Sequence, residues 1–257
     1  MIKVRFLLAL SYRFDVFITI SIRLIFLFAS VFFWKTAFAG IDEVADVNEE
    51  QMLVYSIMAI ILTIVNTFYI ENKVRQKIRQ GDVAIDFIKP VNVFLLYFME
   101  DLGDSISSII QRALPILICA MLFVIVPLPY SLLHFLLFLL SSVFSFLILW
   151  LLAALFALLY FKFIDLGPLA YVKNYLVTIL SGALIPVWFY PEPVQRVLDY
   201  LPFIYIYQLP LSIFIGREDL AGALTGIGIQ IFWCILLALL FNFCRKRIEK
   251  AIIAQGG

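Results

Sequence analysis

The 257-residue chain has few charged residues, 14% of the total, and a single histidine. A soluble domain would carry about 25% charged and about 45–50% apolar residues. Here 64% of the residues are hydrophobic, which is more apolar surface than one soluble core can bury. The composition therefore excludes a soluble globular protein and indicates a chain whose solvent is the lipid bilayer.

Motifs that carry chemistry are also missing. The sequence has no GxxxxGK[ST] phosphate loop, no HExxH, no GxSxG and no GxGxxG. His134 stands away from any acidic cluster, so we interpret it as an interfacial polar residue. Cys119, Cys234 and Cys244 fall in or at the end of apolar stretches without a CxxC pair, as buried or lipid-facing free thiols do. We expect no catalytic residue, no metal site and no cofactor in this chain, and a net charge of +1 gives no reason to expect nucleic-acid binding.

Long charge-free stretches, by contrast, are abundant. A spanning helix needs about 20 apolar residues. The 49 residues from 113 to 161 contain no formal charge, and as one helix they would be about 74 Å long, so they must fold back. The sequence VPLPY at 126–130 supplies the turn, because its prolines interrupt a helix. Counted in this way, the sequence predicts six spans: Val16–Trp34, Gln51–Ile70, Ile106–Val126, Ser131–Phe161, Asn174–Pro191 and Ala221–Cys244.

The distribution of Lys and Arg predicts the orientation. With six spans and both termini in the cytoplasm, 14 Lys and Arg lie inside and three lie outside: Lys35, Arg196 and Arg217. Tyr200–Gly216 is apolar but short, and a seventh crossing there would move the basic C-terminal tail outside, so we predict a re-entrant element. Arg23 and Arg112 lie within spans. Their side chains either extend to the inner interface or pair with nearby acids, or they line a functional path.

The loop after the second span predicts a short amphipathic helix over 71–81. Val74 and Ile78 share one face at i, i+4 spacing among charged residues, and Gly81 would end the helix. Asp82 follows, and Lys89-Pro90 starts the return to the membrane. Such a helix can dock on a partner protein, although the same basic residues could serve only as a topology signal.

Two stretches resemble the permease subunits of type-2 ATP-binding-cassette (ABC) exporters, in particular the small six-span permeases that work in pairs. In residues 181–216 the resemblance rests on a G-x-x-x-P span, an aromatic-Pro, a Leu-Pro-Phe, a further proline and a final glycine. In residues 71–92 it rests on I-R-x-G-D followed by Lys-Pro. The matching residues of the first stretch are Gly182, Pro186, Phe189, Pro191, Leu201, Pro202, Phe203, Pro210 and Gly216.

The resemblance implies one transmembrane permease domain over 1–257. The fold would be an all-α polytopic membrane protein with six transmembrane helices, an N-terminal interfacial helix at Met1–Tyr12, a cytoplasmic coupling helix and a re-entrant outer segment between spans five and six. The expected coupling-helix contacts with an ATPase are Val74, Arg75, Ile78, Arg79, Gly81 and Asp82. The expected outer-gate residues are Pro186, Pro191, Pro202, Phe203 and Pro210. Arg23 and Arg112 are the expected pathway or dimer contacts.

The implied partners are cytoplasmic ABC ATPase subunits, which would bind ATP and Mg²⁺, a second permease chain, the same or related, and membrane lipids. The implied location is the plasma (inner) membrane, and the chain itself would not be an enzyme. Ser, Thr, Tyr and the 26 Phe suit export of a hydrophobic, amphipathic or lipid-like substrate, but so many Phe are equally typical of a lipid-facing surface. The alternative function is an ATP-independent channel or a membrane scaffold.

Overall fold

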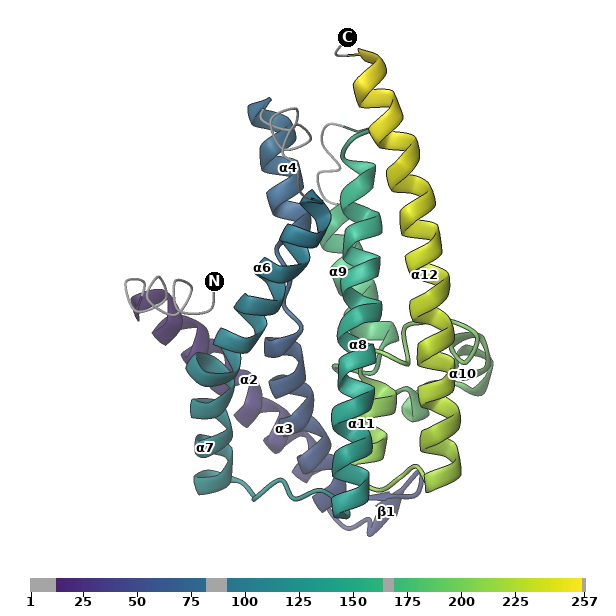
Figure 1. Cartoon of the computed structure of the whole chain (residues 1–257). Helices are drawn as coiled ribbons and strands as arrows, with labels where there is room; N and C mark the ends of the chain where they lie inside the picture. The colour runs from purple at the N-terminus through teal and green to yellow at the C-terminus, as the bar shows by residue number, and fades with distance from the viewer. Residues whose placement is uncertain (1–12, 82–91, 164–168, 256–257) are drawn as a thin grey trace.

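A computed structural model describes residues 13–81, 92–163 and 169–255. These residues form a helical bundle with one small β-hairpin (Figure 1). The elements in chain order are α2 (Arg13–Ala37), β1 (Glu43–Val44), β2 (Val47–Asn48), α3 (Glu49–Val65), α4 (Ile70–Gln80), α6 (Val93–Ser108), the π-helical η1 (Ile109–Ala113), α7 (Leu114–Phe123), α8 (Leu132–Leu159), α9 (Leu169–Leu180), the 3₁₀ turn η2 (Val187–Phe189), α10 (Glu192–Leu198), α11 (Gln208–Phe214) and α12 (Leu220–Gln255).

Within the described residues, five helical segments are long and apolar enough to cross a membrane. They are Val16–Ala37, Glu49–Gln80, Val93–Phe123, Leu132–Leu159 and Leu220–Ile248. These segments correspond to the predicted spans one to four and six, so the prediction of an all-α polytopic membrane protein is confirmed. The predicted interfacial helix Met1–Tyr12 lies outside the described residues.

Two predicted spans differ at their boundaries. Helix α3 ends at Val65 and not at Ile70, because residues 66–69 leave the helical conformation before α4 begins. The third span starts at Val93 and not at Ile106, because the Asn92 side chain accepts hydrogen bonds from the first backbone N–H groups of α6. As a result the acidic residues Glu100, Asp101 and Asp104 lie within α6, whereas the predicted third span began after them.

The fifth predicted span, Asn174–Pro191, is helical only as far as Leu180. Gly182 has a φ of +78°, which only glycine adopts without strain, so the chain turns out of the helix there. A β-carbon at Gly182 would also lie 2.4 Å from Gln208 Oε1, so a larger residue would force the Gln208 side chain to move. Residues 181–216, called the outer segment below, continue as η2, α10 and α11 joined by turns.

Helices α8 and α12 run in the same direction. The Gln230 side chain donates to the Ser141 carbonyl, the Cys234 thiol faces the Phe144 carbonyl and the Phe241 ring packs near Trp150, so sequence position rises together along both helices. Parallel neighbours require the connecting chain to return from one end of the bundle to the other. Helix α9 and the outer segment make that return as a broken pass, and Gly182 and Pro186 interrupt it as the sequence indicates.

Figure 1 shows two distinct ends of the bundle. The tip of α4, the start of α9 and the C-terminal part of α12 lie at one, called the α4 end; the β-hairpin and the α7–α8 connection lie at the other, called the hairpin end. Residues Lys73 to Arg79 and Arg245 to Arg247 gather at the α4 end, whereas Arg217 donates to the Ala45 carbonyl at the hairpin end. The basic residues are thus separated as the charge pattern predicts.

Candidate functional site

Helix α4 confirms the predicted amphipathic helix. It runs over Ile70–Gln80, and Gly81 caps it in the left-handed conformation with its N–H directed at the carbonyls of Lys77 and Ile78. Its apolar side chains recur at i, i+4 and i+8 as Ile70, Val74 and Ile78. Asp82 lies outside the described residues.

The apolar face of α4 packs against its own chain. Val74 is 2% exposed and belongs to a cluster with Ala154 and Ala157 of α8 and Phe241 of α12, and Ile78 packs against the same cluster. These two side chains, which we expected to fill a groove on an ATPase, therefore already have an intramolecular partner. The α4 residues exposed to a partner include Gln76 and Arg79.

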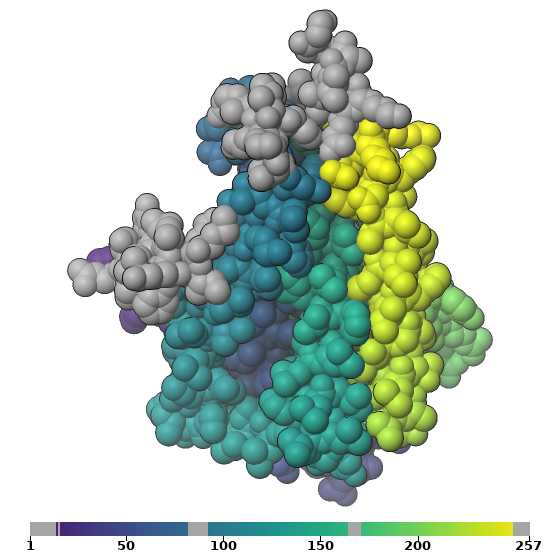
Figure 2. Space-filling view, in the orientation of Figure 1, coloured from purple at the N-terminus to yellow at the C-terminus, as the bar shows by residue number. Residues whose placement is uncertain are grey.

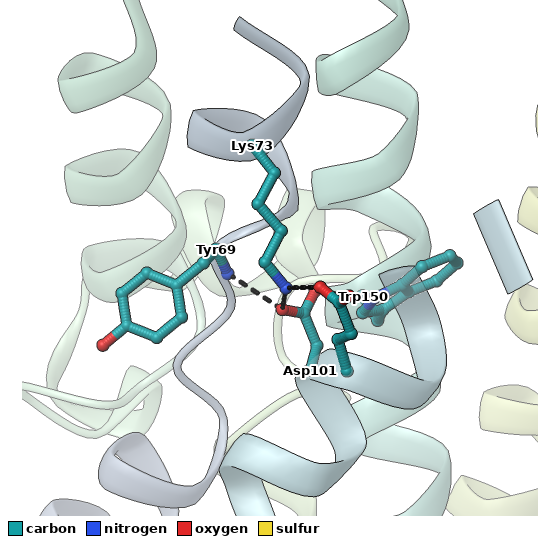
Figure 3. Close-up of polar contacts among 5 residues, drawn as sticks. Tyr69, Lys73, Asp101 and Trp150 are labelled. Carbon is teal, nitrogen blue, oxygen red and sulfur yellow. Dashed lines mark hydrogen bonds and ion pairs between the residues drawn. The ribbon is translucent and has the colours of Figure 1, made fainter. Parts of the chain in front are cut away.

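The break between α3 and α4 is held by a buried carboxylate. Asp101 of α6 is 0% exposed, and its Oδ1 accepts the Tyr69 backbone N–H at 3.3 Å and the Lys73 ammonium at 2.9 Å. The Trp150 indole N–H of α8 donates to Oδ2 at 3.1 Å. Figure 3 shows these groups converging on one carboxylate. We call Tyr69, Lys73, Asp101 and Trp150 the Asp101 cluster.

Burying a charge is costly unless it is paired and hydrogen-bonded. In the Asp101 cluster the ammonium compensates the carboxylate, and Lys73 also contacts Glu100 at 3.0 Å. The Tyr69 N–H, which the non-helical turn would otherwise leave without a helical partner, gains an acceptor in Asp101. The cluster therefore fixes the angle between α3 and α4 and ties both to α6 and α8.

A second ion pair ties α4 to α9. The Lys173 ammonium donates to the Glu71 carboxylate, and both groups are largely buried. Lys173 also lies 5.5 Å from the centre of the Phe156 ring of α8, a distance at which a cation and an aromatic ring attract. A polar cavity of about 140 Å³ adjoins this pair and is lined in part by Asn66, Arg75 and Asn174. Displacement of α4 must therefore displace α6, α8 and α9 or break buried charge pairs.

The predicted outer-gate residues lie in the outer segment, and three of the five are buried. Pro202 and Pro210 are buried, Phe203 packs against the main core, and the exposed Pro191 precedes α10. Pro186 is buried and precedes η2. Helix α11 is buried, as the apolar sequence predicts for a segment inside protein, whereas α10 is exposed along most of its length.

A cluster of hydrogen bonds around Tyr55 and Gln208 holds the outer segment against α3. The hydroxyl of Tyr55 lies 2.7 Å from the Gly182 carbonyl and 3.1 Å from Gln208 Oε1, which also accepts the Val187 N–H at 2.9 Å. The Gln208 N–H donates to the Ser181 carbonyl at 2.9 Å. The broken pass is thus held at the glycine where its helix ends.

Arg23 of α2 and Arg112 of η1 are brought together. Helix α2 packs against η1, and both arginine side chains are half-buried. Among the described residues no carboxylate pairs with either in an ion pair, so the predicted alternative of pairing with nearby acids is not what the structure has. Two of the nearby acids, Glu100 and Asp101, instead contact Lys73 of α4.

In the part of the chain that the structure describes, no group of three or more His, Cys, Asp and Glu side chains could hold a metal ion. Ser131 caps the start of α8 by accepting the His134 backbone N–H, and the His134 ring contacts the Ser131 hydroxyl and the Glu218 carbonyl, which is a structural role. The three cysteines are free thiols.

Comparison with known proteins decides the family. Residues 24–250 match the family described as ABC-2 family transporter protein. The chain belongs to that family. No curated protein and no solved structure matches it significantly. The family match supports the role of an ABC transporter permease and confirms the resemblance that the sequence motifs carry.

In this ABC-2 family chain, sequence reasoning missed the residues that hold α4. Glu71, Lys73, Asp101 and Lys173 were not among the predicted site residues, because a sequence does not reveal which charges pair. A signal was present: Asp101 follows a mostly apolar stretch from Val93, and a carboxylate inside an apolar helix needs a cation.

Proposed function

We propose that this ABC-2 family chain is the permease subunit of an exporter driven by separate ATPase subunits, and that α4 is the element on which the ATPase acts. ATP and Mg²⁺ belong to the ATPase partner. The observation that supports this most is the double attachment of α4, by Lys73 to Asp101 and by Lys173 to Glu71. A push on the exposed face of α4 reaches α6, α8 and α9 through buried contacts, so a short helix can move half of the bundle.

The proposal assigns six crossings to the chain, five by the long helices and one by α9 with the outer segment. Both termini and α4 lie in the cytoplasm, and the membrane is the plasma (inner) membrane. The concentration of basic residues at the α4 end supports this orientation. The outer segment, which Tyr55 and Gln208 hold to α3, then closes the outer end of the path.

A second permease chain completes the transporter. Helix α2 is the least buried of the five long helices, with Phe14, Phe17 and Ile25 strongly exposed, and α9 exposes Tyr171 and Tyr175. These faces, together with the neighbouring Arg23 and Arg112, are the proposed contact surface. The apolar interior suits a hydrophobic, amphipathic or lipid-like cargo.

Site-specific crosslinking tests the ATPase contact. A photo-crosslinking amino acid at Gln76, which is exposed on α4, should attach to a cytoplasmic ATPase in cells. The matched control is Glu192, an exposed residue of α10 on the outer segment, which should not. If neither position captures an ATPase and the purified chain carries none, the chain works without ATP, as a channel or scaffold would.

A further inference from the structure

The polar cavity beside the Glu71–Lys173 ion pair lies where α4, α8 and α9 meet. Helices α6 and α12 lie on either side of α8 in Figure 2, whereas this cavity opens beside α9. Its volume of about 140 Å³ is well below the roughly 300–1,000 Å³ of most small-molecule sites. It therefore has room for one small polar group with a few waters, but not for a nucleotide or a whole lipid. More of the surface that it presents is polar than apolar, so polar groups of its wall can meet a ligand.

The wall of this cavity carries more positive than negative charge. Glu71 supplies one carboxylate, which the Lys173 ammonium neutralises, and Arg75 supplies a second cation. Arg75 is half-buried, and in the part of the chain that the structure describes no carboxylate or carbonyl accepts a hydrogen bond from its guanidinium. A partly buried charge without a partner is costly. Two cations against one carboxylate therefore favour an anion in the cavity.

Two amides at the rim add hydrogen-bond donors. Asn72 follows Glu71 on α4 and Asn174 follows Lys173 on α9, and both asparagines line the cavity and are exposed. Neither side-chain amide is hydrogen-bonded to another group of the described chain. The guanidinium of Arg75 offers five N–H groups in a planar fork that matches the oxygens of a phosphate. Two helices thus present donors to one oxyanion.

The position of the cavity favours the phosphate of a lipid. Leu149 and Ala153 line it from the last turns of the apolar α8, which ends at Leu159. Tyr171 on its wall and Tyr175 nearby on α9 are strongly exposed, and exposed tyrosines of membrane proteins gather where the hydrocarbon meets the head groups. The abundant anion at that depth is the phospholipid phosphate, and basic pockets between membrane helices bind anionic head groups.

We propose that the cavity binds the phosphate of an anionic phospholipid from the leaflet at the α4 end. Arg75 is the principal donor, Asn72 and Asn174 bond to further phosphate oxygens, and the acyl chains lie outside along exposed apolar residues of α9 such as Leu176. The net negative charge of such a head group compensates the second cation. Phosphatidylcholine carries the same phosphate but no net charge, because its quaternary ammonium cancels it.

A lipid bound in this way adds a second link between α4 and α9. Asn72 and Arg75 belong to α4 and Asn174 to α9, so one phosphate bridges the helices that Glu71 and Lys173 already join. The proposal also gives Arg75, which the sequence predicts as an ATPase contact, a ligand in the membrane. That the lipid influences transport rests on the proposed function, but its binding does not.

Retention of lipid by the purified full chain tests the site. The chain, without its ATPase, is mixed in detergent with equal amounts of phosphatidylglycerol and phosphatidylcholine that have the same acyl chains. Native mass spectrometry then counts the lipids that stay bound. We expect phosphatidylglycerol to be retained about fivefold better, which is what one basic residue near a membrane surface contributes. Equal retention of the two lipids would overturn the proposal.

Two variants and one control separate the cavity from general attraction to a basic surface. Arg75→Gln removes the second cation, and Asn174→Asp adds a second carboxylate to the wall, so each should bring the two lipids close to parity. The control is Arg79→Gln, an equal loss of charge on the same helix at an exposed residue that does not line the cavity, and it should keep the preference. A preference that survives either cavity variant, or that the control abolishes equally, would contradict a site at Arg75.

Inorganic phosphate distinguishes a lipid from a soluble phosphate compound. In phosphatidylcholine nanodiscs, added phosphatidylglycerol should raise the unfolding temperature of the chain more than inorganic phosphate does, and Arg75→Gln should remove the difference. Inorganic phosphate that stabilises the chain as strongly would overturn the lipid as the source of the phosphate. Both measurements use the chain without its ATPase, so their results are independent of whether α4 contacts one.

Discussion

Lys73 of α4 and Asp101 of α6 are 28 residues apart in sequence, yet the Lys73 ammonium lies 2.9 Å from Asp101 Oδ1. The Asp101 side chain has no exposed surface. The same carboxylate accepts the backbone N–H of Tyr69 at the point where the chain has left α3 and not yet begun α4. One side chain thus joins two helices and fixes the bend between them.

Replacing that carboxylate should loosen α4. Removing one partner of a buried pair costs about 3–5 kcal/mol, and we expect the lower part of that range for Asp101→Leu, because Lys73 is 20% exposed and retains Glu100. The thermal unfolding temperature of the solubilised chain should fall, and ATP hydrolysis by the complex should continue with reduced transport. Glu100→Gln is the control, since it leaves Asp101 in place. Equal losses from both changes would mean that burial of Asp101 has no special role.

The link to α9 gives a separate prediction. Lys173→Met removes the cation from Glu71 while keeping the length of the side chain. Transport should fall more than the amount of chain in the membrane, because α9 no longer follows α4. Restoring the pair in reverse, with Glu71→Lys and Lys173→Glu together, should recover part of the activity. The absence of any recovery would argue that the pair is only structural packing of α9.

Gly182 should not tolerate a side chain. Gly182→Ala would strain a positive φ and place a β-carbon against Gln208, at a cost of about 1–3 kcal/mol. Gly228→Ala, on α12 with open space around it, should be neutral or stabilise by up to about 1 kcal/mol. The thermal unfolding temperatures of the two variants make the comparison. Similar temperatures would contradict a structural role for Gly182 beside Tyr55 and Gln208.

Gln230 should stabilise the pairing of α8 and α12. It is fully buried, and its amide donates to the carbonyls of Ser141 and Tyr205 at 3.1 and 2.7 Å. Gln230→Leu leaves both carbonyls without this donor, which should cost about 1–3 kcal/mol. Thr225→Val on the same helix loses only a bond to its own helix at Ala221 and should cost less. A smaller shift of the unfolding temperature for Gln230→Leu would show that α8 and α12 pair by apolar packing alone.

The orientation is tested by labelling in intact cells. In a chain whose Cys119, Cys234 and Cys244 are replaced by serine, single cysteines at Asp46 and Glu192 should react with an impermeant thiol reagent. Cysteines at Gln76 and Gln255 should react only after the membrane is opened. Labelling at Gln255 from outside would place an odd number of crossings in the chain.

The sequence alone predicts the structural features that depend on residues close together in the chain. The turn at VPLPY, the extent of α4 and its stop at Gly81, and most of the long apolar helices follow from proline, glycine and the spacing of apolar residues. The break at 66–69 does not, because Asn-Thr-Phe-Tyr contains neither glycine nor proline and the interaction that stabilises it comes from 32 positions further along the chain. Counting charge-free residues therefore merges α3 with the break that follows it.

The hydrogen bond at position 69 is made by the main chain, so it depends little on which residue stands there. Because Asp101 binds an amide hydrogen and not the tyrosine ring, nearly any residue at 69 supplies the same group, and alanine scanning there would pass over the bend entirely. Proline is the exception, since it lacks that hydrogen. Any residue except proline at position 69 therefore keeps this hydrogen bond, whereas substitution of Asp101 removes it. Apart from proline at position 69, only substitutions of Asp101 reveal the importance of the contact.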